Sequence, residues 1–265
     1  MAERAWFTPP PLSSRRRAEW EQDLEGTEPF RIEVRGQQLD GWTAGEGPLV
    51  LLVHGWGGRA AQMARLGKEI AAAGFRVAAV DSPGHGQAGL ARTNVFEMSE
   101  ALASIVDRFG APVAVVAHSL GAMVTLHAME DAMPEGLVLL APVLDVGEVL
   151  DTFSERAQLF PWTARALRRR ITSFVYQEWP GSPRGAFADL GSAKTLIVHD
   201  PADRDTLFAT SAGLAAVSPD TDLHLADGLG HSGVLRDPGI ADRVVDFLGG
   251  IRPASTPTLA SHPNR

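Results

Sequence analysis

The chain contains no cysteine, which excludes disulfides, thiol nucleophiles and zinc–thiolate sites. It also lacks an excess of positive charge. The formal net charge of -8 at pH 7 argues against a nucleic-acid partner, because binding to phosphate groups needs a basic surface. No apolar run approaches the length of a membrane span, and the first residues lack the apolar core of a secretory signal. We therefore expect a soluble, cytoplasmic protein that has no membrane partner.

What the chain does contain is enough apolar material for a large core, since 45% of its 265 residues are hydrophobic. Short apolar runs alternate with helical patterns, which predicts an α/β fold with a mostly parallel sheet of about eight strands flanked by helices. The first two strands are expected to pair antiparallel at one edge. Strands are predicted over 31–35, 38–44, 48–54, 76–81, 113–118, 137–142, 195–200 and 221–226. Helices are predicted over 59–73, 94–109, 119–132, 206–217 and 239–249.

The stretch 144–192 interrupts the alternation of strands and helices. It holds no strand pattern but several aromatic residues, and a loop of this length inside a domain is uncommon unless it is functional. We interpret it as a small helical cap; the alternative is a helix pair that only covers a sheet edge. The remaining organisation predicted is an N-terminal arm at 1–28 with a short helix near 14–24, a core formed by 29–143 and 193–252, and a flexible tail at 253–265.

The sequence Ala117-His118-Ser119-Leu120-Gly121 follows the apolar run Val113–Val116 directly and leads into a helical pattern. Such a strand–turn–helix arrangement is typical of a nucleophile elbow, in which a sharp turn holds a serine hydroxyl above the end of a sheet. The residues two positions before and after Ser119 are small, as the close approach of neighbouring backbones there requires. The alternative role for Ser119 is that of a helix N-cap.

A serine nucleophile needs a base, and a carboxylate that orients the base. His231 is the candidate base, because it lies in a glycine-rich loop between the last predicted strand and the last helix. Asp203 is the candidate acid, because it follows the seventh strand and gives the chain order Ser, Asp, His. Asp200 and Asp205 are close competitors, and an acid after the sixth strand would be Asp145.

The oxyanion of a tetrahedral intermediate would be stabilised by backbone N–H groups. Leu120 is one expected donor, because it follows the nucleophile at a helix N-terminus. Trp56 is the other, in the loop His54-Gly55-Trp56-Gly57-Gly58. His54 and His85 lie in predicted turns, where histidines more often brace the backbone than react.

Four motifs resemble those of the α/β-hydrolase fold superfamily. They are the oxyanion loop at 54–58, the turn Asp81-Ser82-Pro83-Gly84-His85-Gly86, the elbow at 117–121 and the pair Gly230-His231. The resemblance implies a hydrolase with the triad Ser119, His231 and Asp203. The region around the acid departs from the family pattern, because it contains two further aspartates near Asp203.

The predicted activity is hydrolysis of a small carboxylic ester or thioester through an acyl-enzyme, with no cofactor and no metal. Trp56, His118, Phe160 and Trp179 are the candidate substrate-binding residues. A carbon–carbon bond hydrolase, a perhydrolase-like enzyme and a non-catalytic small-molecule-binding module on the same scaffold are the alternatives.

Overall fold

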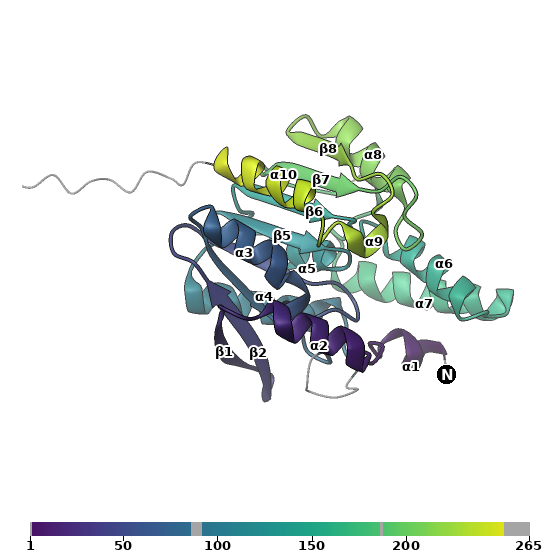
Figure 1. Ribbon diagram of the computed structural model, residues 1–265. Coiled ribbons are helices and arrows are strands. Elements are labelled where there is room, and N and C mark those ends of the chain that lie inside the picture. Colours follow the sequence, from purple (N-terminus) through teal and green to yellow (C-terminus); the bar gives the residue numbers. More distant parts are fainter. Residues whose placement is uncertain (1, 86–91, 186–187, 252–265) are drawn as a thin grey trace, which may run out of the picture.

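An eight-stranded sheet forms the centre of the molecule in the computed structural model, which describes residues 2–85, 92–185 and 188–251 (Figure 1). The strand order is β1-β2-β4-β3-β5-β6-β7-β8. The first pairings, β1 with β2 and β2 with β4, are antiparallel, and all later ones are parallel. The strands are β1 (Glu28–Val34), β2 (Gln37–Ala44), β3 (Leu49–Val53), β4 (Arg76–Val80), β5 (Ala114–His118), β6 (Gly136–Leu140), β7 (Lys194–His199) and β8 (Thr221–Leu225). The predicted fold class and antiparallel edge are therefore confirmed.

The central strands are apolar along their whole length because helices cover both faces of the sheet. In β5, Val115 and Ala117 pack into the core on the side of α4 and α5, whereas Ala114 and Val116 pack into the core on the side of α3 and α10. The edge strand β8 has no fully buried residue. Outside the segment between β6 and β7, the longer helices are α2 (Ser14–Asp23), α3 (Ala64–Ala72), α4 (Val95–Phe109), α5 (Gly121–Ala128), α8 (Phe208–Val217) and α10 (Pro238–Gly249).

Three local predictions need correction. The helix predicted over 59–73 is divided into a 3₁₀ turn, η1 (Ala60–Met63), and α3. The helix predicted over 119–132 begins only at Gly121, because Ser119 has a φ of 56° that no α-helix contains. Two short helices were not predicted: α1 (Ala2–Trp6) and α9 (Gly230–Gly233). Both are too short to give a periodic apolar pattern.

Between β6 and β7 lie α6 (Val146–Arg156) and α7 (Pro161–Glu178), which pack against each other and extend from the body of the molecule (Figure 1). Arg168 of α7 donates to the carbonyl of Gly147 and pairs with Asp151 of α6. These helices provide the predicted helical cap, whose boundaries at 144 and 192 remain a proposal. The predicted tail at 253–265 and Gly86 of the predicted turn lie outside the described residues.

No helix among the described residues is both long enough and apolar enough to cross a bilayer.

Candidate active site

Ser119 occupies a strained turn between β5 and α5. Its φ of 56° lies in the left-handed region, which is costly for a residue with a Cβ and is maintained only when the surroundings enforce it. Three backbone hydrogen bonds do so here: the Ser119 N–H donates to Leu140 O (3.0 Å), and the Ser119 carbonyl accepts from Ala122 N (3.1 Å) and Val143 N (3.0 Å). The turn therefore fixes the direction of the hydroxyl before any substrate binds.

Two glycines permit the close packing around this turn. A Cβ on Gly55 would lie 2.7 Å from the Ser119 Cβ, and a Cβ on Gly121 would lie 2.6 Å from the Val53 carbonyl oxygen. Any side chain at either position would displace the turn or the neighbouring loop. This is the physical basis of the small-residue pattern around Ser119.

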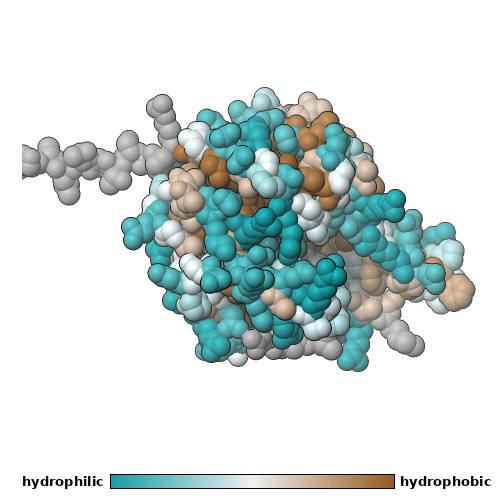
Figure 2. All heavy atoms as spheres, viewed as in Figure 1, coloured by the Kyte–Doolittle hydropathy of each residue, from teal (hydrophilic) through white to brown (hydrophobic). Residues whose placement is uncertain are grey.

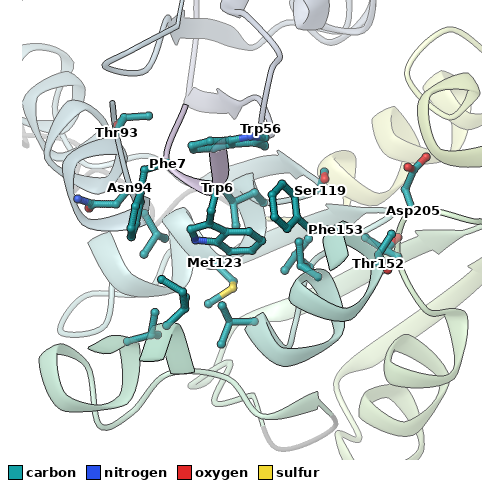
Figure 3. Close-up of a pocket in the computed structure, with 18 of the residues that line it drawn as sticks. Trp6, Phe7, Trp56, Thr93, Asn94, Ser119, Met123, Thr152, Phe153 and Asp205 are labelled. Carbon is teal, nitrogen blue, oxygen red and sulfur yellow. The ribbon is translucent and has the colours of Figure 1, made fainter. Parts of the chain in front are cut away.

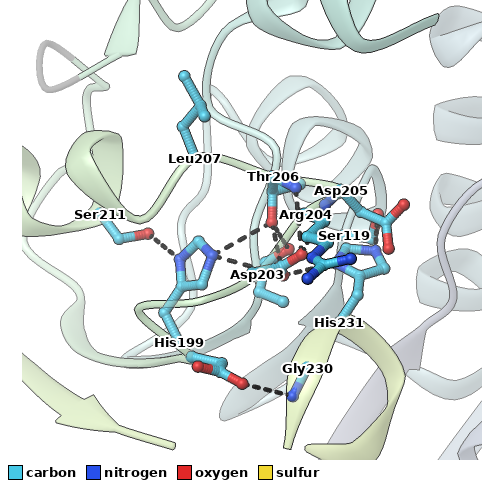
Figure 4. Close-up of polar contacts among 12 residues, drawn as sticks. Ser119, His199, Asp203, Arg204, Asp205, Thr206, Leu207, Ser211, Gly230 and His231 are labelled. Atoms are coloured by element: carbon cyan, nitrogen blue, oxygen red, sulfur yellow. Dashed lines mark hydrogen bonds and ion pairs between the residues drawn. The ribbon is translucent and has the colours of Figure 1, made fainter. Parts of the chain in front are cut away.

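The structure brings Ser119, His231 and Asp203 into one hydrogen-bonded line (Figure 4). His231 Nε2 lies 3.0 Å from Ser119 Oγ, and His231 Nδ1 lies 2.9 Å from Asp203 Oδ2. The Asp203 carboxylate is fully buried, and the His231 side chain is 15% exposed. The three residues come from the β5–α5 turn, the loop after β7 and the short helix α9 after β8. Asp203 therefore accepts from Nδ1 and leaves Nε2 facing the hydroxyl.

The Asp203 carboxylate is stabilised as an anion. Burial on its own would raise its pKa, but hydrogen bonds from His199, from His231 and from the Asp205 amide outweigh that effect and hold the pKa of Asp203 well below its usual value. Thr206 adds a hydroxyl donor at 3.0 Å from Oδ2. His199 is itself positioned by Ser211, whose hydroxyl lies 2.7 Å from its Nδ1. The loop thus presents a permanent negative charge to His231.

The other three aspartates considered from the sequence make different contacts. Asp200 accepts from the amides of Ala202 (2.8 Å) and Gly230 (2.6 Å), so that it anchors the loop that carries His231. Asp205 pairs with Arg156 of α6. Asp145 is the N-cap of α6 and accepts from the Gly147 amide.

His118 was predicted to contact substrate, and the structure corrects this prediction. Its side chain is 3% exposed and does not line the cavity, and its Nε2 donates to the His231 carbonyl at 2.9 Å. Burial, together with the neighbouring His231, lowers the pKa of His118 to about 4. His118 is therefore neutral near pH 7 and supports the backbone of His231 without opposing a positive charge on it.

The two predicted oxyanion donors lie beside Ser119. Trp56 and Leu120 line the same cavity as Ser119 and His231. Among the described residues, neither of their backbone N–H groups has a hydrogen-bond acceptor. Two free N–H groups next to a nucleophile, one of them at the N-terminus of α5, are the arrangement that stabilises a developing oxyanion.

Two buried histidines hold the loop that carries Trp56. His85 Nε2 accepts from the Gly57 amide (3.0 Å), and His54 Nε2 accepts from the Ser82 amide (2.9 Å). Burial lowers the pKa of His54 to about 3 and that of His85 to about 4. Both rings are therefore neutral acceptors near pH 7, in agreement with the bracing role expected for histidines in these turns.

A cavity of about 290 Å³ opens beside Ser119 (Figure 3). Most of its lining is apolar and comes from the β5–α5 turn, the oxyanion loop, α6, α7 and, unexpectedly, the N-terminal helix α1. The lining residues on the apolar side include Trp6, Phe7, Trp56, Val95, Leu120, Met123, Val143, Val146, Val149, Phe153, Ile171, Phe174 and Val175. The cavity thus joins a polar reaction centre to a predominantly apolar chamber.

Of the aromatic residues predicted to bind substrate, only Trp56 lines this cavity. Phe160 is 71% exposed and stacks on Trp162 at the tip of the α6–α7 hairpin. Trp179 is 4% exposed and packs edge-on against His127 of α5. Both predictions are corrected: the ring of Phe160 faces solvent, and that of Trp179 fills the core. An aromatic residue in a cap can be exposed to solvent or buried in the core, and the sequence pattern does not distinguish the two environments.

Sequence reasoning missed Trp6 and Phe7. Their only signal was the occurrence of two adjacent aromatic residues in an arm that is otherwise polar or rich in proline. Such a pair can pack against another part of the protein or stay in solvent, as Phe160 and Trp162 do, so the pattern by itself does not place it in the cavity.

Among the residues that the structure describes, one cluster has spacing suited to a metal ion: ligating atoms of Asp203, Asp205 and His231 lie within 4.8 Å of one another. These atoms already have partners. Asp203 accepts from His231, and Asp205 pairs with Arg156. The donor set therefore fits a hydrogen-bonded triad better than a cation site.

This site lies at the carboxyl end of the parallel strands of an α/β-hydrolase fold, and comparison with known proteins gives the family. The family described as "Serine aminopeptidase, S33" matches residues 47–211, which is more than half of the chain. The chain belongs to this family of hydrolases.

Individual relatives are more distant. A pimeloyl-[acyl-carrier protein] methyl ester esterase from Chromobacterium violaceum is 37% identical over 86 residues, which are 32% of this chain and 32% of the relative. The match thus spans about a third of that curated relative. Among solved structures, a bacterial membrane phospholipase A is 17% identical with a TM-score of 0.67 over 91% of both chains. A thermophilic esterase is 18% identical with a TM-score of 0.60, over 85% of this chain and 98% of the other. These structural likenesses show the fold.

Proposed function

We propose that this protein is a serine esterase that cleaves carboxylic esters or thioesters with an apolar acyl group, using Ser119, His231 and Asp203. The observation that carries the proposal is the continuous hydrogen-bonded line from Asp203 through His231 to Ser119, which ends at the wall of a mainly apolar cavity. The relative that acts on a methyl ester supports the same reaction class.

The proposed reaction follows from these contacts. Ser119 Oγ attacks the ester carbonyl carbon while its proton moves to His231 Nε2, and the carbonyl oxygen becomes an oxyanion that accepts from the Trp56 and Leu120 amides. The tetrahedral intermediate collapses, the bond to the leaving group breaks, and His231 gives its proton to the departing alcohol or thiol. Water then attacks the acyl-enzyme with His231 again as base, which releases the acid and restores Ser119. Asp203 stabilises the imidazolium in both halves.

The cavity favours an ester over a peptide with a free N-terminus. Recognition of an α-ammonium group needs an uncompensated carboxylate near the scissile bond. Asp205 is the one carboxylate that lines the cavity in the described part of the chain, and it is paired with Arg156. The apolar walls instead match an acyl chain, whose transfer from water is favourable in proportion to the area that it buries.

Covalent labelling tests the proposed nucleophile. A fluorophosphonate should label the wild-type protein at Ser119, and Ser119→Ala should abolish labelling and lower kcat for p-nitrophenyl butyrate by roughly five orders of magnitude, because a triad acts as a unit. Ser104→Ala is the matched control, since the Ser104 hydroxyl only donates to the Glu100 carbonyl on the exposed side of α4.

A mass spectrum that placed the adduct on another serine would contradict the assignment. Butyryl thioester and leucine p-nitroanilide, assayed in parallel, distinguish ester, thioester and peptide preference. Faster turnover of the anilide than of the ester would favour an aminopeptidase instead.

A further inference from the structure

The N-terminal helix α1 forms a wall of the cavity beside Ser119. Trp6 and Phe7 both line the cavity, although they precede the β1 strand by more than 20 residues and the nucleophile by more than 110. Figure 3 shows the Trp6 ring between Trp56 and Met123, with Phe153 beside it. We propose that Trp6 and Phe7 determine the acyl-chain preference of the enzyme; this inference rests on the proposed esterase function.

Contacts from several elements fix the position of this wall. The Phe7 carbonyl accepts from the Thr93 amide at 2.9 Å, just before α4. The Trp6 ring packs edge-on against Phe153 of α6, with ring centroids 5.3 Å apart. The Arg92 guanidinium lies over the Phe7 ring at 5.5 Å. These contacts place the two aromatic rings in the cavity rather than in solvent.

Further contacts connect the arm to the cap and to the oxyanion loop. Glu3 pairs with Arg170 of α7 at 3.2 Å. Beyond the helix, Pro10 lies so close to Gly57 that a Cβ on Gly57 would be 2.8 Å from the Pro10 Cγ. The arm therefore passes from α7, across the cavity, to the loop that carries the Trp56 donor.

The role of the wall is to bind rather than to react. Neither Trp6 nor Phe7 has a hydrogen bond to a triad residue in the described part of the chain. The reacting end of the cavity is formed by Ser119, His231 and Leu120. Trp6 and Phe7 instead add apolar area to the chamber that receives the acyl chain, and each methylene buried there raises kcat/KM by about fourfold.

No residue of α1 is itself buried, so the fold does not depend on this helix for its core. A helix of five residues is also not stable by itself in water, because nucleation is costly. The wall is consequently maintained by its contacts with α4, α6 and α7, and its truncation should change the cavity without unfolding the protein.

Chain-length profiles test the proposal. Trp6→Ala should lower kcat/KM for p-nitrophenyl octanoate by about tenfold or more and change that for the acetate by less than about twofold, because the acetate does not extend to the wall. Trp6→Phe should restore most of the octanoate activity. Phe160→Ala is the matched control: it removes an aromatic ring from the tip of the α6–α7 hairpin, at a position that is 71% exposed and outside the cavity.

A binding measurement keeps the test independent of catalysis. In a Ser119→Ala background, methyl octanoate binding followed by tryptophan fluorescence should weaken about tenfold when Trp6→Ala or Phe7→Ala is added, and should be unaffected by Phe160→Ala. Glu3→Lys, which places a like charge against Arg170, should weaken binding in the same direction while leaving both aromatic rings in place.

The outcomes separate the two proposals. If octanoate binding depends on Trp6 and Phe7 but the fluorophosphonate does not label Ser119, the proposed binding role of the wall would stand and the proposed esterase function would be overturned. If Ser119 is labelled and acetate is turned over, but Trp6→Ala lowers kcat/KM equally for acetate and octanoate, the esterase function would stand and the role of the wall in chain-length preference would be overturned. Unchanged octanoate binding in both aromatic variants would also overturn the wall.

Discussion

The catalytic end of the sheet and the cover formed by α1, α6 and α7 are held by different kinds of interaction. Around the triad, directional hydrogen bonds fix the side chains: Asp203 accepts from His199, Asp205, Thr206 and His231, and two buried histidines each accept from a backbone amide. The cover is joined to the body by aromatic packing, as between Phe174 of α7 and Phe96 of α4, and by ion pairs with exposed members, such as Arg156 of α6 with Asp205.

The difference follows from what each region has to do. Proton transfer requires atoms at hydrogen-bond distance and a fixed charge, so the catalytic end is built from buried, directional contacts. Binding of an apolar chain depends chiefly on the area that it covers and has no required direction. The catalytic end is therefore expected to tolerate almost no substitution, and the cover to tolerate many.

The largest contrast in kcat is expected between substitutions of two aspartates that follow the carboxyl ends of neighbouring strands. Asp203→Asn should lower kcat by about four orders of magnitude, as the loss of the carboxylate does in a serine protease triad, because the imidazole loses its orientation and its counter-charge. Asp145→Asn should stay within about tenfold, since Asp145 only caps α6. Both are measured as kcat on one ester at one ionic strength.

Asp200→Asn and Asp205→Asn extend this comparison, and the kcat of each should lie between those of Asp203→Asn and Asp145→Asn. A collapse of activity in Asp145→Asn, with Asp203→Asn near the wild type, would move the acid to the loop after β6. Circular dichroism of each variant shows whether a loss of activity reflects unfolding.

Within the cap, substitution of two aromatic residues should change the stability of the protein by very different amounts. Trp179→Ala removes a ring that is 4% exposed and should cost about 3–5 kcal/mol in the free energy of unfolding. Phe160→Ala removes a ring that is 71% exposed and should cost less than about 0.5 kcal/mol. Urea unfolding measures both. Equal costs would contradict the assignment of Trp179 to the core and Phe160 to the surface.

Acidification should lower the stability of the folded protein through three buried histidines. The folded-state pKa values of His54, His85 and His118 are lowered to about 3, 4 and 4, from an unfolded value of 6.5. The unfolded state therefore binds more protons below pH 6.5, and stability that is complete above that pH is lost on acidification. At pH 5 each histidine accounts for a loss of up to about 2 kcal/mol.

Asp81 acts in the opposite direction, because burial raises its pKa from 3.8 to about 6. Its folded carboxyl takes up a proton as the pH falls through 6, which stabilises the folded state and offsets part of the histidine effect. His85→Gln should therefore reduce the loss of stability between pH 7 and pH 5 in urea titrations. Parallel losses in the variant and the wild type would show that His85 does not remain neutral in the fold.

Local patterns in the sequence were sufficient for the sheet, for most of the longer helices and for two residues of the candidate triad, Ser119 and His231. All eight strands were predicted to within a few residues. The central strands gave the strongest signal, because strands covered on both faces must be apolar throughout. Ser119 was found from the small residues beside it, because a strained turn and close backbone packing restrict them, and His231 from its loop, in which Gly228 and Gly230 have a positive φ. Asp203 was selected by its spacing, but its three competitors had similar local sequences.

Tertiary structure alone decided which aspartate faces His231, which aromatic residues line the cavity and where the N-terminal arm lies. Asp200, Asp203 and Asp205 differ only in the direction that one loop gives to each carboxylate, and Trp6 and Phe160 differ only in what packs over them. Short-range patterns record the constraints of a turn or a strand. Contacts between segments a hundred residues apart leave no such record, because apolar packing can be satisfied by many residues at many positions.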